Sequence, residues 1–370
     1  MISENEILNL IALSKVKNVG SVTAKNLISY CGSAEAVLKS KKHQLIRIPG
    51  IGEKTADELL SSVTLSLAEK ELNFSIKNEV KILSYLDKRF PYRLNRYPDA
   101  PIILFYKGNA DLNCDKIVSI VGTRAITNYG QNLVDELIMD MKHLDILVCS
   151  GLAYGVDSAA HRKCVVEEIN TVGVLGHGLD ILYPSENKTL ANKMITKGGL
   201  LTEFGIETRP DRENFPMRNR IVAGICDALV VVETKEEGGS MITAEYAFEY
   251  NKDVFAFPGK VNDVFSKGSN KLIKSNKAQL IENGNDLLKA MSWDLNKGKE
   301  KSAREKLLFI ELTEPEQEVV NILKESSPVH IDVFYNKMNL SPGMIASVLL
   351  ELEFKGLLNE QPGKRYTLVN

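Results

Sequence analysis

The stretch IVSIVGTRAITNYGQNLVDELIMDMKHLDILVCSGLAYGVDSAAHRK, residues 117–163, decides the fold class. It begins with an apolar run at 117–121, continues with an amphipathic segment of helix length at 127–142, and reaches a second apolar run at 146–150. Uninterrupted β-branched runs separated by helices indicate parallel strands that are covered on both faces. This stretch therefore predicts a strand–helix–strand unit.

The same alternation continues to about residue 290. Further apolar runs occupy 171–176, 200–204, 228–233 and 254–258, with helical patterns between them. We expect an α/β domain over 71–290 with an extended Rossmann-like parallel sheet core, whose ligands bind beyond the carboxyl ends of the strands.

The segment before this domain, residues 1–70, predicts short helices and contains two similar phrases. They are LSKVKNVGSVTAKNLI (13–28) and LIRIPGIGEKTADELL (45–60), each with a glycine turn that leads into a helix. Such a turn exposes backbone N–H groups to a phosphate oxygen, and the pattern resembles the SAM-like helix-hairpin-helix module that binds DNA. Gly50, Gly52 and Lys54 are candidate secondary DNA contacts. A purely structural helical hairpin is the alternative, and the first phrase has Asn18 where the leading glycine would stand.

Two segments follow the central domain. Residues 291–312 carry the charge run KGKEKSAREK, typical of a linker. Residues 313–370 predict three helices and a hairpin with Gly363 in its turn, which together describe a winged helix with Ser341 as the N-cap of its recognition helix. That helix, MIASVLLELEF, carries almost no side chains that could read bases. A role in packing or protein contact is therefore favoured over DNA readout, and a transcription regulator is disfavoured.

Composition excludes several classes of protein. The formal net charge is −2, which rules out a histone-like polycation but leaves room for a local basic groove. No apolar run reaches the ~18 residues of a membrane span, and the N-terminus lacks a basic signal-peptide front. Five cysteines without a CxxC pair are typical of reduced thiols. We expect a cytoplasmic protein without membrane contact, metal or cofactor.

Four loops follow the predicted strands and suit a phosphate. Helix N-termini offer free N–H groups, and arginine can donate two parallel hydrogen bonds to phosphate. The last loop, 237–244, is neither a dinucleotide fingerprint nor a P-loop, so a mononucleotide-type anion pocket fits it better. The candidate phosphate-binding residues are Gly122, Thr123, Arg124, Ser150, Gly151, Arg218, Asn219, Arg220, Gly238, Gly239, Ser240 and Thr243.

Each of these signals has a structural alternative. Glycine turns after strands are common for packing reasons alone, and Arg218 and Arg220 could each pair with Glu203, Glu213 or Asp227. Tyr154 is a candidate base-stacking platform, although a buried packing role is the favoured interpretation. His161 and His177 have no partnered nucleophile, so neither is interpreted as a catalytic base.

The loops resemble those of the DNA-processing protein A family, also called DprA or Smf. The matching phrases, spread over residues 97–259, are YPDAPIILFYKGN, IVGTR, SGLAYGVDSAAH, GHGLDILYPSEN, LLTEF, NFPMRNRIVAG, GGSMITAEYAFE and FAFPG. The resemblance implies a homodimeric, non-enzymatic protein that binds single-stranded DNA, protects incoming strands during natural transformation and helps to load a RecA-type recombinase. It assigns phosphate binding to the three arginines above and N–H donation to the Ser150-Gly151 and Gly238-Gly239-Ser240 turns. Lys260, directly after the FAFPG turn, would add charge to the groove.

An enzymatic alternative remains. The glycine pair also resembles the phosphate cradle of the LOG-like nucleoside monophosphate phosphoribohydrolases, and Glu245 is close to it in the chain. Met241, however, replaces a glycine of that family's turn.

Overall fold

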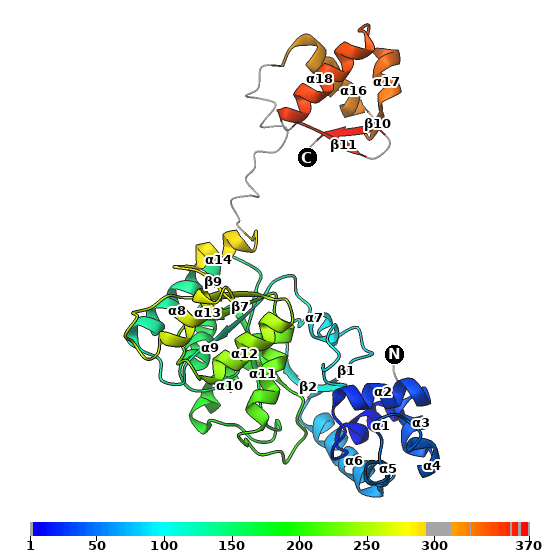
Figure 1. Ribbon diagram of the computed structural model, residues 1–370, viewed down its shortest axis with the longest axis vertical. Helices are drawn as coiled ribbons and strands as arrows, with labels where there is room; N and C mark the ends of the chain where they lie inside the picture. The colour runs from blue at the N-terminus through cyan, green and yellow to red at the C-terminus, as the bar shows by residue number, and fades with distance from the viewer. Residues whose placement is uncertain (1–2, 294–311, 326, 356, 362–363, 369–370) are drawn as a thin grey trace. The chain divides into compact units, whose positions relative to one another are not determined.

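The computed structural model describes residues 3–293, 312–325, 327–355, 357–361 and 364–368 (Figure 1). The chain forms two compact units, Met1–Ser292 and Trp293–Asn370. Most of the predicted linker, including its charge run, lies outside the described residues, as does Gly363 of the predicted wing turn.

The larger unit contains a nine-stranded sheet with the order β1-β2-β6-β5-β4-β3-β7-β8-β9. The strands from β6 to β9 in this order are parallel neighbours, whereas β2 runs antiparallel to β6 and β1 antiparallel to β2. The parallel core is therefore as predicted, with an antiparallel edge added. The strands are β1 (Lys81–Ser84), β2 (Ile103–Gly108), β3 (Ile117–Val121), β4 (Leu147–Ser150), β5 (Asn170–Val174), β6 (Gly199–Thr202), β7 (Ala228–Val231), β8 (Asp253–Ala256) and β9 (Gln279–Leu280).

Helices cover both faces of this sheet. The helices α8 (Asn128–Met141), α9 (Val156–Val166) and α10 (Lys188–Lys197) connect the strands from β3 to β6 and pack side by side. The chain then returns through α11 (Asn214–Ile225) to β7, and α11 packs against α12 (Gly239–Glu249) on the other face. Because the winding direction reverses between β3 and β7, a crevice forms beyond the carboxyl ends of these two strands. The remaining elements are α7 (Tyr92–Asn95), η1 (Ser185–Asn187), α13 (Lys267–Lys274) and α14 (Gly284–Ala290).

The stretch that decided the fold class folds as its pattern predicts. Every residue of β3 and β4 is buried, because helices cover both sheet faces. On α8 the buried residues include Leu133, Val134, Leu137 and Ile138, whose spacing places them on one side of the helix. The apolar face of this helix is thus what holds it against the strands.

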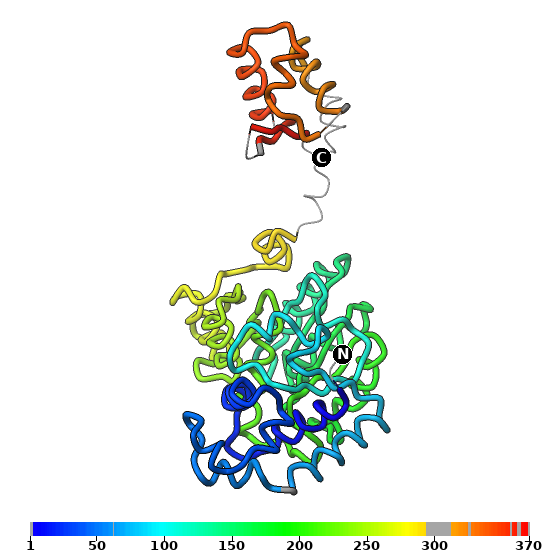
Figure 2. Tube along the Cα trace, turned by 90° about the vertical axis from the view of Figure 1, so that its right-hand side faces the viewer, coloured from blue at the N-terminus to red at the C-terminus, as the bar shows by residue number. Residues whose placement is uncertain are grey.

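The N-terminal helices lie against the β1–β2 edge of the sheet, as Figures 1 and 2 show in blue and cyan. Their hydrophobic core includes Ile103 and Phe105 of β2. A polar tie reinforces the contact: the buried Glu71 carboxylate accepts hydrogen bonds from Lys15 Nζ at 2.7 Å and from the Ile206 amide at 2.8 Å. These helices therefore belong to the larger unit. They are α1 (Glu4–Ser14), α2 (Ser21–Cys31), α3 (Ala34–Lys39), α4 (Lys42–Leu45), α5 (Glu53–Leu59) and α6 (Ser62–Lys77).

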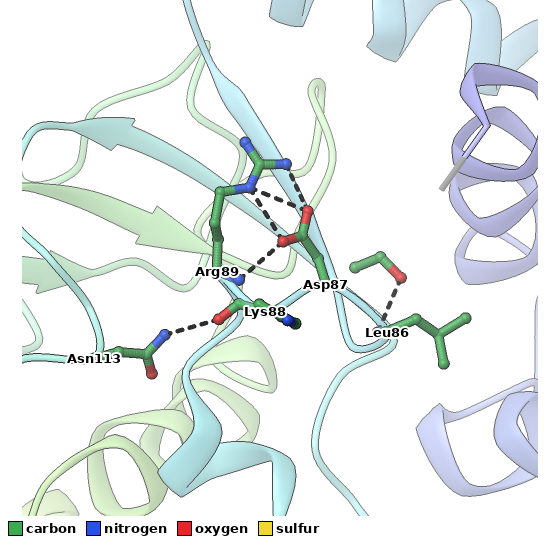
Figure 3. Close-up of polar contacts among 6 residues, drawn as sticks. Leu86, Asp87, Lys88, Arg89 and Asn113 are labelled. Atoms are coloured by element: carbon green, nitrogen blue, oxygen red, sulfur yellow. Dashed lines mark hydrogen bonds and ion pairs between the residues drawn. The ribbon is translucent and has the colours of Figure 1, made fainter. Parts of the chain in front are cut away.

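The loop after β1 is held by local polar contacts, which Figure 3 shows in close-up. The Arg89 side chain donates to both carboxylate oxygens of Asp87, with Nη2 2.5 Å from Oδ2. Asn113 Nδ2, which comes from the segment before β3, donates to the Lys88 carbonyl at 3.2 Å. The loop after β1 is thereby fastened to the segment that precedes β3.

The smaller unit is a winged helix, as predicted. It contains α16 (Glu314–Glu325), α17 (Ile331–Lys337) and α18 (Pro342–Phe354), and a sheet with the order β10-β12-β11. Ser341 caps α18, since its Oγ accepts a hydrogen bond from the Met344 amide at 3.4 Å. The strands are β10 (Val329–His330), β11 (Leu358–Gln361) and β12 (Arg365–Leu368), of which the two-residue β10 was not predicted. Across both units, none of the described helices is long and apolar enough to cross a lipid bilayer.

Candidate nucleic-acid binding site

A cleft of about 690 Å³ opens beyond the carboxyl ends of β3, β4 and β7. It lies where the winding direction of the sheet reverses, the position at which doubly wound sheets bind ligands. All four predicted loops reach it. The lining residues that the sequence predicted are Gly122, Thr123, Arg124, Gly151, Arg218, Asn219, Gly238, Gly239, Ser240 and Thr243.

Three predicted residues do not line the cleft. Ser150 is fully buried, and its Oγ donates to the Ile120 carbonyl at 2.6 Å. Arg220 pairs with Glu203 and lines a separate cavity, because two residues along a helix rotate a side chain by about 200° away from Arg218. The ion-pair alternative therefore describes Arg220. Lys260 is exposed but lies outside the cleft lining.

The predicted secondary contacts lie in the N-terminal helices. Gly50 has a left-handed backbone with φ of 85°, Gly52 is the N-cap of α5, and Lys54 is exposed. The glycine thus provides the turn that the motif requires. Contact of these three residues with DNA stays a prediction.

Arg218 is a buried wall residue of the cleft, with 4% of its surface exposed. Its Nη1 donates to the Gly151 carbonyl at 2.5 Å and also to the Val174 carbonyl. Burial lowers the pKa of this guanidinium to about 10, and Asp157 opposes the shift. Arg218 thus joins the ends of β4 and β5 to α11, and its contact with phosphate stays a prediction.

Asp157, in the first turn of α9, is one of the cleft residues that sequence reasoning missed. Its Oδ2 accepts hydrogen bonds from the Gly151 amide at 3.1 Å and the Ala153 amide at 3.3 Å. Burial raises the pKa of this carboxyl, while Arg218 lowers it. Asp157 occupies the Gly151 N–H in this structure, so donation from that amide to a phosphate would require this hydrogen bond to break and stays a prediction. An acidic residue in a first helical turn was the available signal.

Three exposed cations line the cleft: Arg124, Arg212 and Lys235. None of them forms an ion pair with another described residue. Arg124 Cζ lies 5.3 Å from the ring centroid of Phe215, and Lys235 Nζ lies 5.3 Å from that of Phe265. These cations are therefore available to an anionic ligand. Sequence reasoning selected Arg124 but missed Arg212 and Lys235, which lie just before the predicted segments 214–220 and 237–244.

The glycine pair also lines the cleft. Gly238 is the N-cap of α12 and provides no side-chain cap, so the N–H groups of Gly239 and Ser240 are available, whereas the Met241 amide donates to the Gly238 carbonyl at 3.0 Å. A Cβ added at Gly239 would meet no atom within 4 Å, so the space above this turn is open. Ser240 Oγ is already bonded to Thr234 Oγ1 at 2.7 Å and serves the turn. The helix start and the three cations together suit phosphate groups.

Comparison with known proteins identifies the family. Residues 81–292 match the family model described as DNA recombination-mediator protein A. The chain belongs to this family. Residues 10–63 match a SAM-like helix-hairpin-helix tandem, and residues 309–364 match the DprA winged helix domain. The predicted resemblance and the three-part fold class are thereby confirmed.

Individual DprA and Smf proteins are similar in sequence and structure to long stretches of this chain. Protein Smf of Synechocystis is 30% identical over 96% of this chain and 97% of its own. The DNA processing protein DprA of Streptococcus pneumoniae is 40% identical over 55% of this chain and 72% of its own. An X-ray structure of the S. pneumoniae protein matches with a TM-score of 0.66 and 32% identity, covering 78% of this chain and 98% of that one. A Helicobacter pylori DprA structure, which concerns the single-stranded DNA binding mode of that protein, matches with a TM-score of 0.53 and 26% identity over 58% and 97% of the two chains.

Aromatic rings line one side of the cleft in this DprA family member. Tyr183 and Phe215 lie with ring centroids 6.1 Å apart. Tyr154, next to them, is 39% exposed and donates from its hydroxyl to Glu186 Oε2 at 2.8 Å. The interpretation of Tyr154 as a buried packing residue is therefore wrong, because its hydroxyl finds its partner at the surface.

The residues weighed for catalysis are engaged elsewhere. His161 is fully buried with Nδ1 2.7 Å from Thr171 Oγ1, and burial lowers its pKa to about 3. Glu245 bonds to Lys277 at 2.5 Å and does not line the cleft. Among the residues that the structure describes, no group of His, Cys, Asp and Glu side chains is arranged to hold a metal ion.

Proposed function

We propose that this DprA family member is a recombination mediator that binds the phosphate backbone of single-stranded DNA in the cleft. The observation that carries the proposal is the set of exposed, unpaired cations Arg124, Arg212 and Lys235, which line the same cleft as the uncapped start of α12. Both features stabilise negative charge. The H. pylori relative, whose structure concerns single-stranded DNA binding, supports the choice of ligand.

Binding in this cleft is expected to tolerate any sequence. Arginine, lysine and backbone amides contact phosphates rather than base edges. Tyr183 and Phe215 offer ring faces on which a base can stack, and stacking is also sequence-tolerant. A duplex keeps its bases stacked inside, so it would lose this second contribution.

Membership of the family supports a proposal for the wider role. We infer that the bound strand is protected from nucleases and passed to a RecA-type recombinase during natural transformation. The protein would act as a homodimer in the cytoplasm without catalysing a reaction. The description of the family as recombination mediators supports this role.

Glycosidic hydrolysis is the less favoured function. Such a reaction needs a carboxylate at the scissile bond. Glu245 is bound to Lys277 outside the cleft lining, and the Asp157 carboxylate is occupied by two backbone amides. A phosphate could still bind the glycine pair without being part of a substrate.

The test is fluorescence anisotropy with a single-stranded oligonucleotide and its duplex over a salt series. Wild type should prefer the single strand. Lys235→Ala and Arg124→Ala should each bind more weakly, with the log–log salt slope shallower by about 0.7 per lost phosphate contact. Lys193→Ala is the matched control, because Lys193 is exposed and lines a different cavity, near the amino ends of β5 and β6. The cleft is not the binding site if wild type fails to bind a single strand at low salt. The same conclusion follows if Lys235→Ala and Arg124→Ala both keep the wild-type salt slope.

Two further assays address the finer role. Wild type, but not Lys235→Ala, should protect a single strand from a nuclease and accelerate the assembly of a RecA-type filament on it. Incubation with nucleoside monophosphates should release no free base. Release of base that is lost in a variant of the glycine pair would instead support the hydrolase.

A further inference from the structure

A second cavity, of about 350 Å³, lies between the first N-terminal hairpin and the edge of the sheet. It shares no lining residue with the DNA cleft. Apolar side chains form much of its wall, including Ile102, Phe204 and Met217. Apolar walls around a few polar groups are typical of sites for small organic ligands.

The polar end of this cavity is a buried ion pair that is only half satisfied. Arg220 Nη2 donates to Glu203 Oε2, but Arg220 Nη1 and Glu203 Oε1 are buried without a hydrogen-bond partner in the structure. Arg220 is only 8% exposed. Unpaired buried polar atoms cost free energy, so a ligand that offers both a donor and an acceptor here would be stabilised.

The start of α2, an eleven-residue helix, also lines the cavity. Its N-cap, Gly20, provides no side-chain hydrogen bond. The first-turn N–H groups of Ser21, Val22 and Thr23 therefore lack intrahelical partners and lie at the positive end of the helix dipole. This is the hairpin whose leading glycine is replaced by Asn18, and its helix start faces the central domain.

The charges select the class of ligand. Glu203 and Asp99 are both lining residues, so a bare inorganic anion would meet two carboxylates. Guanine suits the pair better, because its N1–H and 2-amino group can donate to a carboxylate while its adjacent O6 accepts from an arginine. A phosphate on the same molecule could then accept from the free amides of α2.

We propose that this cavity binds a guanine nucleotide, with the base edge against Glu203 and Arg220 and the phosphate at the start of α2. The nucleotide is either free or the terminal guanosine of a DNA strand. The inference does not rest on DNA binding in the cleft, since the two sites have separate residues.

The first experiment is calorimetric titration of the full chain with 5′-GMP, 5′-IMP and 5′-AMP. GMP should bind most tightly. IMP lacks the 2-amino donor and should bind about tenfold more weakly, because one carboxylate oxygen loses its partner. AMP should be weaker still, since it presents a lone pair at N1 to the Glu203 carboxylate. Equal affinity for the three nucleotides, or no binding of GMP at millimolar concentration, would overturn the proposal.

Variants locate the site. Glu203→Gln should remove the preference for GMP over IMP, with thermal unfolding followed to verify the fold. Val22→Trp, at a half-exposed rim position, should block GMP without disturbing the core. Val166→Trp is its control, because Val166 is 72% exposed on α9 and does not line the cavity. GMP binding that survives Val22→Trp but is lost in Arg124→Ala would place the nucleotide in the DNA cleft and contradict the assignment.

Oligonucleotides distinguish the two sources of the nucleotide. If strand ends occupy the cavity, an oligonucleotide with a 5′-terminal guanosine should bind more tightly than one with a 5′-terminal adenosine, and only Val22→Trp should remove the difference. Equal affinities together with GMP binding identify the free nucleotide as the ligand. The salt-dependent binding of both strands should remain in Val22→Trp, so a failure of the cleft and a failure of this cavity give different results.

Discussion

Arg218 Nη1 donates a hydrogen bond to the backbone carbonyl of Gly151 at 2.5 Å. A cationic wall residue of the proposed DNA-binding cleft is thus held by the loop that follows β4. Asp157 holds the same loop from its other side, through the amides of Gly151 and Ala153. The shape of this wall therefore depends on a buried arginine and a buried carboxylate that both bond to backbone.

Arg218→Ala should destabilise the protein as well as weaken DNA binding. The substitution leaves the Gly151 and Val174 carbonyls without their donor, so the free energy of unfolding should fall by about 2–4 kcal/mol. Urea denaturation measures the change. A variant with wild-type stability and weaker DNA binding would show that Arg218 is a ligand residue rather than a wall residue.

Gly151→Ala should disturb the same contact from the other partner. A Cβ at this position would lie closer than 3.0 Å to the Arg218 guanidinium, so the side chain must move. We expect a loss of about 1–3 kcal/mol in the free energy of unfolding. Gly239→Ala is the control, since an added Cβ there meets nothing within 4 Å, and its stability should stay within about 0.5 kcal/mol of wild type.

The stability should fall in acid because His161 is buried in its neutral form. Its pKa is about 3 in the folded protein, against 6.5 in the unfolded chain. Above pH 6.5 neither state binds this proton, whereas between pH 6.5 and about 3 only the unfolded state does. The free energy of unfolding should therefore decrease by up to about 1.4 kcal/mol per pH unit as the pH falls through this window.

Urea denaturation over pH 4–8 tests the assignment. In His161→Gln, the free energy of unfolding should depend less steeply on pH than in wild type, by up to about 1.4 kcal/mol per pH unit. Identical slopes for the two proteins would mean that His161 is not the group responsible.

The buried Lys15–Glu71 ion pair, which joins the N-terminal helices to the loop after β6, should contribute more to the free energy of unfolding than a surface ion pair. Lys15→Met leaves the Glu71 carboxylate, 2% exposed, with only the Ile206 amide as partner. Breaking a buried pair costs about 3–5 kcal/mol, so the free energy of unfolding should fall by an amount of that order. Lys271→Met breaks a pair with Glu236 in which both side chains are more than half exposed, and should change stability by less than about 1 kcal/mol. Similar losses in the two variants would contradict this ranking.

The proposed domain boundary can be tested by expressing residues 1–292 alone. The helix-hairpin-helix and Rossmann-like parts form one compact unit over this range, and the winged helix belongs to the other. We expect the fragment to unfold cooperatively and to keep the wild-type salt slope for single-stranded DNA. Aggregation of the fragment, or loss of its binding, would show that the central unit depends on the remaining chain.

The parallel core was readable from the sequence because β-branched runs buried on both faces leave a continuous apolar signal. The antiparallel edge was not. The run 102–106 has the same composition as a parallel strand, and strand direction depends on how the chain enters the sheet. β1 has only four residues, of which the last two are buried, so its pattern was too short to detect.

The sequence predicted which loops form the site but not which atoms contact one another. Glycine turns and strand ends correctly indicated which segments converge on the cleft. They could not show that Arg218 would bond to carbonyls, that Arg220 would find Glu203, or that Asp157 would occupy the Gly151 amide. These outcomes depend on distances between elements far apart in the chain. Lys235 and Arg212 were missed because an isolated charge in a loop has no pattern.

If the cleft binds DNA as proposed, its backbone-anchored wall has a kinetic consequence. Since Arg218 and Asp157 are already bonded before any strand arrives, the wall is preorganised and little conformational entropy is lost when it is occupied. Encounter would then be governed by diffusion and by long-range attraction to Arg124, Arg212 and Lys235. Substitutions of the stacking rings Tyr183 and Phe215 would therefore change the dissociation rate of a bound strand more than its association rate.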